Sequence, residues 1–314
     1  MLALRSVVAR IATKTGCYYA GQWACGCLGG GFILAFHDQP ADRFERQIEA
    51  LGPNEPVHLS ELFQRARTGR STAGLFAVTF DDGVAATVRE ISAACRRRQW
   101  PVTFYLPTGY LDERRGLPFQ LWRRVVPHVP RAVLSLPSRV LDLSAPEAFA
   151  RFRQDVEMAM YTQPRHSYQP LIEELVRWVL EHELATREQL QPPEPIPWGE
   201  VVELSEHEAI RFESHGVTHT AAVALPPAAL EAELETSKRR ISEHTNRDCR
   251  HFCYPFGGRE SIGPVAPSIA AKIYDTAVTM SRGRLRRHSW SLVPRIPIYE
   301  RDDPDVARLK ILTL

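Results

Sequence analysis

Residues Leu75–Gly83 read LFAVTFDDG, and this stretch decides the fold class. Its apolar, β-favouring residues run directly into two adjacent carboxylates and a glycine. This pattern predicts a buried strand that presents acid groups at its C-terminal end, which is the end where α/β folds gather their functional groups. An ordinary Asp-Gly turn after a strand is the alternative, because both residues are common turn formers.

The adjacent Asp81 and Asp82 repel one another unless a cation or a shared proton compensates. They therefore indicate a metal site, with one carboxylate left to act as a base. Downstream, Phe212–His219 (FESHGVTH) contributes His215 and His219, whose spacing on one helical turn would place both imidazoles on the same side. Two histidines and one aspartate bind zinc-like ions and leave a position open for water or substrate, as catalytic sites do. Two surface histidines near a helix start are the alternative.

Four segments, in order, resemble the polysaccharide deacetylase family with the NodB-homology domain (carbohydrate esterase family four). They are Thr79–Gly83, His215–His219, Phe252–Gly257 (FCYPFG) and Pro294–Pro297 (PRIP). The resemblance extends over about residues 31–299, apart from a middle segment without a counterpart. It implies a distorted (β/α) barrel of about seven parallel strands, which agrees with the strand-helix alternation on either side of the first motif.

The resemblance also implies roles for individual residues. Asp81 would be the general base, and Asp82, His215 and His219 would hold a divalent metal, for which zinc is the default ion. The backbone amide of Phe256 would bind the oxyanion of the tetrahedral intermediate.

Further residues near the groove follow from the same motifs. Tyr254 and Pro255 of the third motif are expected to contact the substrate. His37 follows Gly29–Phe36, a glycine-rich entry into a short predicted strand, at the place where relatives carry a Tyr-His pair near the substrate groove; a structural role for His37 is the alternative.

Two positions depart from the family pattern. Many relatives carry an arginine in the third motif where this chain has Cys253, so we expect Arg295 to pair with the base in its place; capping of a surface strand end is the alternative for Arg295. Most relatives supply the general acid from a Leu-x-His motif near the C-terminus. That motif is missing here, and His288 is only the nearest histidine in position, so the general acid stays unassigned.

The chain is predicted to have an N-terminal helical extension (1–28) and a deacetylase domain (29–314) interrupted by a helical insertion (117–202) over the barrel mouth. Trp122, Tyr161, Tyr168 and Trp198 within the insertion are either core residues or sugar-stacking residues. The amphipathic residues 2–14 are expected to pack on the domain, with peripheral membrane contact as the alternative.

The charge balance and the cysteine pattern indicate which partners and which cellular compartment to expect. The 314 residues carry 39 Lys and Arg against 37 Asp and Glu, and this balance does not indicate a nucleic-acid partner. The first thirty residues lack the apolar run of a secretory signal. Six cysteines without paired CxxC spacing fit a reducing cytoplasm, so we expect a cytoplasmic protein, with the membrane surface as the alternative location.

The expected activity is hydrolysis of N-acetyl groups on amino-sugar residues of a polysaccharide or glycolipid. Two alternatives stay open at this point. One is a hydrolase of another non-peptide amide on the same fold, and the other is a glycan-binding protein that has lost catalysis. The sequence leaves the identity of the glycan, the metal and the oligomeric state undecided.

Overall fold

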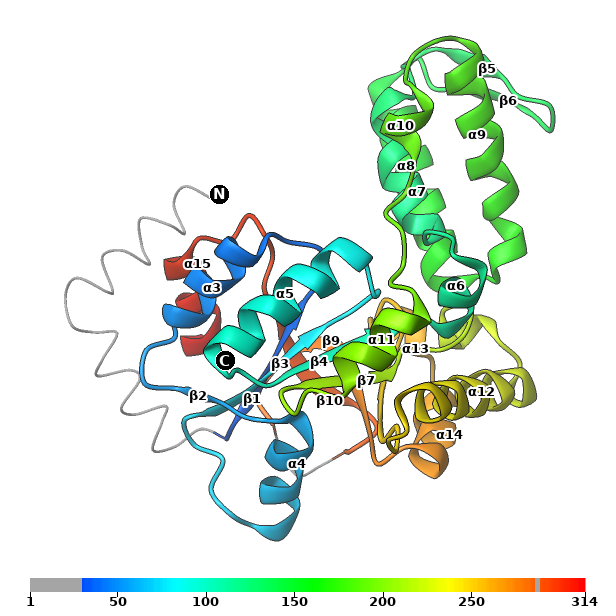
Figure 1. The fold of residues 1–314 in the computed structure, drawn as a ribbon. Coiled ribbons are helices and arrows are strands. Elements are labelled where there is room, and N and C mark those ends of the chain that lie inside the picture. Colours follow the sequence, from blue (N-terminus) through cyan, green and yellow to red (C-terminus); the bar gives the residue numbers. More distant parts are fainter. Residues whose placement is uncertain (1–29, 286–288, 314) are drawn as a thin grey trace.

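The computed structural model describes residues 30–285 and 289–313, so the predicted extension 1–28 and His288 lie outside the described residues. Seven parallel strands form a closed barrel in the order β1-β10-β9-β8-β7-β4-β3, because β1 pairs with both β10 and β3 (Figure 1). The short strand β2 (Glu55–Pro56) pairs with β3 outside this ring. The barrel strands are β1 (Phe32–Phe36), β3 (Leu75–Phe80), β4 (Val102–Leu106), β7 (Ile210–Ser214), β8 (His251–Cys253), β9 (Thr276–Arg282) and β10 (Val293–Pro297). The expected distorted (β/α) barrel is confirmed.

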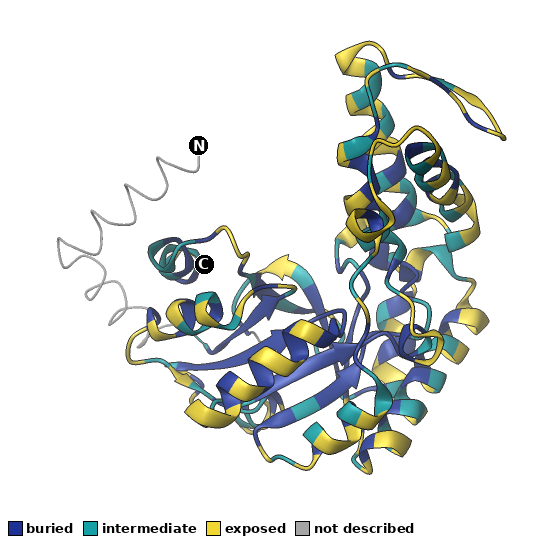
Figure 2. Cartoon of the chain, turned by 45° about the horizontal axis from the view of Figure 1, so that its top comes forward, coloured by how far each residue is buried: buried dark blue, intermediate teal, exposed yellow. Residues whose placement is uncertain are grey.

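Helices cover the outside of the barrel, and their solvent-facing sides are exposed while the strands are buried (Figure 2). They are α3 (Ala41–Glu49), α4 (Leu59–Thr68), α5 (Ala85–Arg98), α6 (Thr108–Glu113), α11 (Trp198–Ser205), α12 (Pro227–Thr245), α13 (Arg259–Ile262), α14 (Ala266–Ile273) and α15 (Pro304–Leu312). Among the described residues, no helix combines the length and the apolar character that crossing a bilayer requires.

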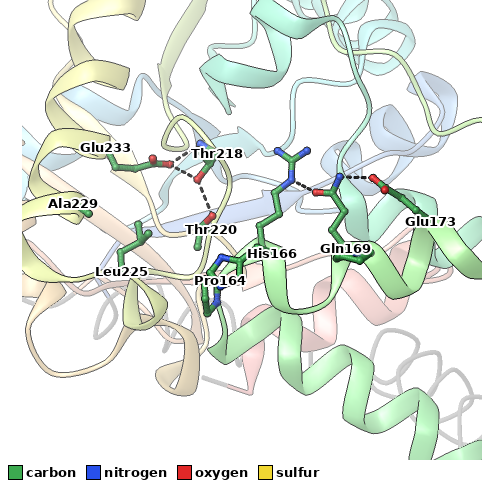
Figure 3. A pocket seen from close by; sticks show the side chains of 11 residues that line it. Pro164, His166, Gln169, Glu173, Thr218, Thr220, Leu225, Ala229 and Glu233 are labelled. Carbon is green, nitrogen blue, oxygen red and sulfur yellow. Dashed lines mark hydrogen bonds between the residues drawn. The ribbon is translucent and has the colours of Figure 1, made fainter. Parts of the chain in front are cut away.

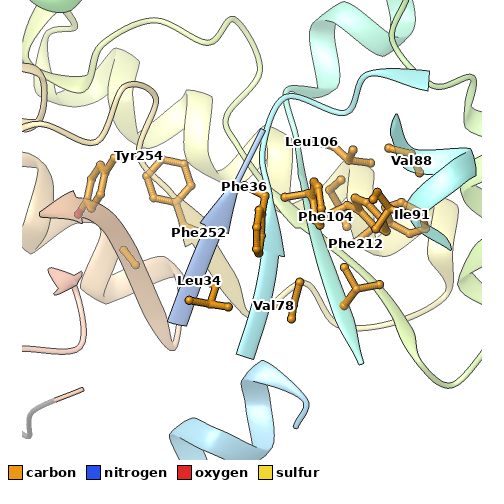
Figure 4. Packing of buried hydrophobic residues seen from close by; sticks show 14 of the residues in the cluster. Leu34, Phe36, Val78, Val88, Ile91, Phe104, Leu106, Phe212, Phe252 and Tyr254 are labelled. Atoms are coloured by element: carbon orange, nitrogen blue, oxygen red, sulfur yellow. The ribbon is translucent and has the colours of Figure 1, made fainter. Parts of the chain in front are cut away.

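The side chains of β3 alternate between the two faces of the barrel wall, as the period of two in a strand requires. Phe76, Val78 and Phe80 point outward into the main hydrophobic core, where they pack with side chains of the neighbouring strands and of α5 (Figure 4). Thr79 points inward, because its hydroxyl lies 3.0 Å from the guanidinium of the buried Arg295. Asp81 continues this alternation one residue beyond the strand and also points into the barrel.

Residues 118–190 form a separate helical group that projects from one end of the barrel (Figure 1). This group has its own hydrophobic core. Its elements are α7 (Pro118–Val125), η1 (Val126–His128), the antiparallel pair β5 (Val133–Ser135) and β6 (Val140–Asp142), α8 (Pro146–Thr162), η2 (Arg165–Ser167), α9 (Gln169–Glu181) and α10 (Arg187–Leu190). The limits 117 and 202 of a distinct insertion stay a prediction.

The chain returns from this group along the end of β3. The amide of Ala85 donates to the carbonyl of Glu194, and the amide of Ile196 donates to the carbonyl of Gly83. Gly83 itself has φ +65°, and a Cβ there would lie 2.7 Å from Leu106. The turn after the two aspartates therefore requires glycine, and the helical group is anchored beside it.

Candidate metal centre

The two aspartates at the end of β3 are both buried but are directed differently. The backbone of Asp81 is still hydrogen-bonded to β1, since its amide donates to the carbonyl of Phe36 over 3.0 Å. Asp82 adopts a left-handed backbone with φ +73°, a conformation that costs free energy in a residue with a Cβ and is concentrated at functional sites. This change of backbone direction separates the two carboxylates, so that Asp81 faces Arg295 and Asp82 faces two histidines.

His215 and His219 lie on the loop that follows β7, and not on one helical turn as the spacing predicted. That prediction is wrong because the loop is curled by Gly216 (φ +80°) and by His219 itself (φ +52°). The imidazoles still converge, with ring centroids 4.8 Å apart. The ring nitrogen Nδ1 of His215 lies 2.7 Å from the carbonyl oxygen of Cys253, which fixes the orientation of that ring.

Glu233 on α12 holds this loop in shape. One of its carboxylate oxygens accepts hydrogen bonds from the amides of Val217 and Thr218 and from the hydroxyl of Thr218. Nothing in the spacing of the residues could reveal this role, because the contact joins segments 15 residues apart through a loop without periodicity.

The donor set fits a divalent metal. The Oδ1 atom of Asp82 lies 3.6 Å from Nε2 of His215 and 3.5 Å from Nε2 of His219. Two ligand atoms each about 2.1 Å from an ion in tetrahedral geometry lie roughly 3.4 Å apart. The oxygen of Asp82 therefore lies at about the zinc-ligand spacing from each histidine nitrogen, and the side chains of Asp82, His215 and His219 are all buried.

The electrostatics of these three residues favour a cation. Burial would raise the pKa of Asp82, but hydrogen bonding to His215 and His219 holds that pKa well below its usual value. Burial lowers the pKa of His219, which favours the neutral imidazole that binds metals. Burial also acts to lower the pKa of His215, yet the nearby Cys253 and Asp82 raise it well above normal. A divalent ion would take the place of that proton.

Asp81 is held by Arg295, as expected from the departure at Cys253. Nη1 and Nη2 of Arg295 lie 2.8 and 2.7 Å from the two carboxylate oxygens of Asp81, and the guanidinium is fully buried. Burial would raise the pKa of Asp81, but the charge and hydrogen bonds of Arg295 outweigh it and lower that pKa. Arg295 is therefore no surface cap, and Asp81 is ionised at neutral pH.

Cys253 lies beside this pair, with its sulfur 3.0 Å from Nη2 of Arg295 and 3.5 Å from Oδ2 of Asp81. Together with Asp81 and His215 it forms a second group of potential ligands. Burial raises the pKa of the Cys253 thiol, and both oxygens of Asp81 already accept from Arg295. This second group is therefore a poorer metal site than the first.

His37 lies at the end of β1 and faces Asp81. Its Nε2 is 3.8 Å from Oδ2 of Asp81, and 36% of its side chain is exposed. The sequence predicted its place near the groove but not its distance to Asp81.

The third motif forms a turn next to the histidines. Phe256 has φ +62°, and among the described residues its amide donates no hydrogen bond, so it is available to an oxyanion. Tyr254, by contrast, is buried in the core, and its hydroxyl donates to the carbonyl of Ser291. Pro255 is also buried, and its carbonyl accepts from Gly257. Both residues shape the turn from within, and their contact with a substrate stays a prediction.

A pocket of about 560 Å³ lies between the helical group and the loop that carries His219 (Figure 3). One wall includes Arg165 and Gln169, and the other includes Thr218, Thr220 and Glu233. Of the four aromatic residues considered for sugar stacking, Trp122 and Tyr168 are buried in the core of the helical group, and Trp198 stacks on His244. Tyr161 contacts Phe256.

Removal of either histidine ligand tests the metal site. His215→Ala and His219→Ala are each expected to lose bound metal and activity together while the fold survives, because two ligands hold the ion far more weakly than three. Metal content of the purified variants measures this. His182→Ala, at an exposed histidine in the helical group, is the matched control. Full metal occupancy in both ligand variants would contradict the site.

Comparisons with known proteins point in one direction. The family model described as polysaccharide deacetylase matches residues 68–262. Among solved structures, the Streptococcus pyogenes deacetylase PplD in complex with acetate is similar at 13% identity and TM-score 0.56, covering 90% of this chain and 97% of that one. IcaB from Ammonifex degensii is similar at 16% identity and TM-score 0.56, with the same coverage. The BpsB deacetylase domain from Bordetella bronchiseptica is similar at 15% identity and TM-score 0.52, covering 85% and 95%. No curated protein matches the chain.

Proposed function

The chain belongs to the polysaccharide deacetylase family, and from this we propose that it is a metal-dependent hydrolase that removes N-acetyl groups from amino-sugar residues of a glycan or glycolipid. One observation carries the proposal. At the C-terminal end of the barrel strands, three side chains that could together hold a metal ion lie next to a carboxylate held ionised by a buried arginine.

Each residue has a distinct part in the proposed reaction. Asp82, His215 and His219 would hold the ion, which supplies Lewis-acid polarisation of a carbonyl when bound. Asp81 accepts the proton of the attacking water, and Arg295 orients it through two parallel hydrogen bonds. A carboxylate has about four lone-pair sites, so Asp81 can accept this proton while bound to Arg295. The amide of Phe256 donates to the oxyanion.

His37 is the proposed donor of the proton that the departing amine needs. It faces Asp81 at 3.8 Å and is partly exposed, so it can reach a substrate bound over the metal site. An amine leaving group requires a proton, whereas the phenolate of an aryl ester leaves without one. His37→Gln should therefore lose about 10²-fold or more in turnover of an N-acetylated amino sugar and retain most of its turnover of an aryl acetate ester. Equal losses on both substrates would contradict this role.

The pocket beside the His219 loop favours a substrate larger than a simple amide. Its volume of about 560 Å³ lies within the range of small-molecule sites. Polar side chains of the helical group and of the barrel face into it (Figure 3). Its lining includes none of Asp81, Asp82, His215 and His219, so it would accept a part of the substrate away from the reacting amide.

Acetate release from N-acetylglucosamine oligomers of increasing length tests the function. We expect the zinc-loaded chain to release acetate, to lose the activity with a chelator and to regain it with zinc. Small ureides and imides assayed in parallel test for hydrolysis of another amide. Binding of the oligomers without acetate release would instead favour a glycan-binding protein that has lost catalysis.

A further inference from the structure

The two histidines of the metal centre are held in different ways. Nδ1 of His215 lies 2.7 Å from the carbonyl oxygen of Cys253, and such a contact from the second ring nitrogen is the usual means of orienting a metal-binding histidine. For His219, no hydrogen bond to Nδ1 is found in the described part of the chain. Its orientation must therefore depend on packing of the ring.

Three rings surround His219. Phe119 stacks on it, with centroids 5.6 Å apart and planes at 27°. Phe256 and His215 meet it edge to face, at 4.9 and 4.8 Å. These separations lie within the range at which aromatic pairs attract one another. The stacked ring covers one face of the imidazole, and the two edge-to-face rings restrict its rotation.

The stacked ring does not come from the barrel. Phe119 is in the first turn of α7, within the helical group, and it also contacts Phe256 at 6.2 Å. Tyr161, at the end of α8, packs against Phe256, and the centroids of these two rings lie 5.0 Å apart. Phe256 therefore packs with the core of the helical group as well as with the metal centre.

Backbone strain makes this support necessary. His219 and Phe256 both have left-handed backbones, with φ of +52° and +62°. Side-chain-bearing residues keep such conformations only when their surroundings hold them there. The helical group supplies part of those surroundings from a segment about 100 residues away in sequence from His219.

We propose that Phe119 is a positioning residue for the metal ligand His219, so that the helical group at residues 118–190 completes the metal centre instead of only covering it. The proposal rests on the metal site of the proposed function. It does not depend on which substrate is cut, and its test requires no turnover.

The test measures the affinity of the full chain for zinc by competition with a chromophoric chelator. Phe119→Ala is expected to raise the dissociation constant by about 10-fold or more, which is the usual effect of removing a residue that orients a ligand. Phe119→Tyr, which keeps the ring, should remain close to the unaltered chain. Phe152→Ala is the matched control, since Phe152 is a partly buried residue of the same core that contacts Trp122 and not His219.

Cobalt substitution adds a spectroscopic readout that a purely structural role would not change. The visible absorption of bound cobalt reports ligand geometry, so its spectrum should change in Phe119→Ala and not in Phe152→Ala. Unchanged zinc affinity in Phe119→Ala, or an equal loss in Phe152→Ala, would overturn the proposal. A chain that binds zinc tightly but releases no acetate would refute the proposed activity, and the affinity comparison would still decide the role of Phe119.

Discussion

Asp81→Asn is expected to retain the metal and lose about 10²-fold or more in turnover, the usual size of a general-base effect, whereas Asp82→Asn is expected to lose the metal itself. The two side chains are adjacent in sequence but have different partners. Asp81 is bound by Arg295 at 2.7 and 2.8 Å, and Asp82 faces the two histidines at 3.5 and 3.6 Å.

The comparison requires metal content and turnover to be measured on the same preparations. Because both variants replace a carboxylate with an amide of the same shape, each serves as the other's control. Excess zinc should restore part of the activity of Asp82→Asn and none of that of Asp81→Asn. Identical behaviour of the two variants would show that the assignment of base and ligand is wrong.

Arg295→Met is expected to have the second large effect, on both rate and stability. It leaves the buried carboxylate of Asp81 without a cation, and breaking one side of a buried ion pair typically costs about 3–5 kcal/mol. Burial then acts on Asp81 without the cation that most strongly opposes it, so the pKa of Asp81 rises. The acidic limb of the pH-rate profile should move to higher pH while metal content is unchanged.

Two companion variants separate the contributions of Arg295. Arg295→Lys keeps the charge but loses the planar fork, so it should preserve the acidic limb better than the rate. The double variant Asp81→Asn with Arg295→Met removes both charges and should be more stable than Arg295→Met alone. An acidic limb that does not move in Arg295→Met would exclude Arg295 as the group that keeps Asp81 ionised.

The free energy of unfolding should also fall at acidic pH. Arg295 holds the pKa of folded Asp81 below its usual value, so this residue contributes stability above about pH 4, near the pKa of an unfolded aspartate. The contribution is lost as the pH falls through the lower pKa of the folded state. Thermal unfolding of the unaltered chain should therefore show a loss of stability at acidic pH that is smaller in the double variant, in which the depressed pKa of Asp82 still contributes its own share.

The strand-helix pattern of the sequence predicted a parallel sheet, and the resemblance to the deacetylase family implied both the barrel and the residues of the candidate site. The apolar run that ends at Asp81 and Asp82 is followed by a helix and another strand, and this order indicates a parallel sheet. Strands of a parallel sheet are buried on both faces, so their sequences are almost continuously apolar. The missing third-motif arginine at Cys253 was enough to predict the contact between Arg295 and Asp81. That contact joins residues 214 positions apart, and its catalytic role stays a proposal.

Only the tertiary structure decided how the remaining residues meet. The loop of His215 and His219 has no periodicity that predicts its path, and its curvature depends on Glu233 from another helix. The burial of Tyr254 follows from neighbours on other strands and helices. The stacking of Phe119 on His219 depends on how a separately packed helical group docks on the barrel. Sequence patterns show the period at which apolar residues recur, and therefore which face of a helix or strand is buried. Contacts between loops, or between the barrel and the helical group, form only when the whole chain has packed.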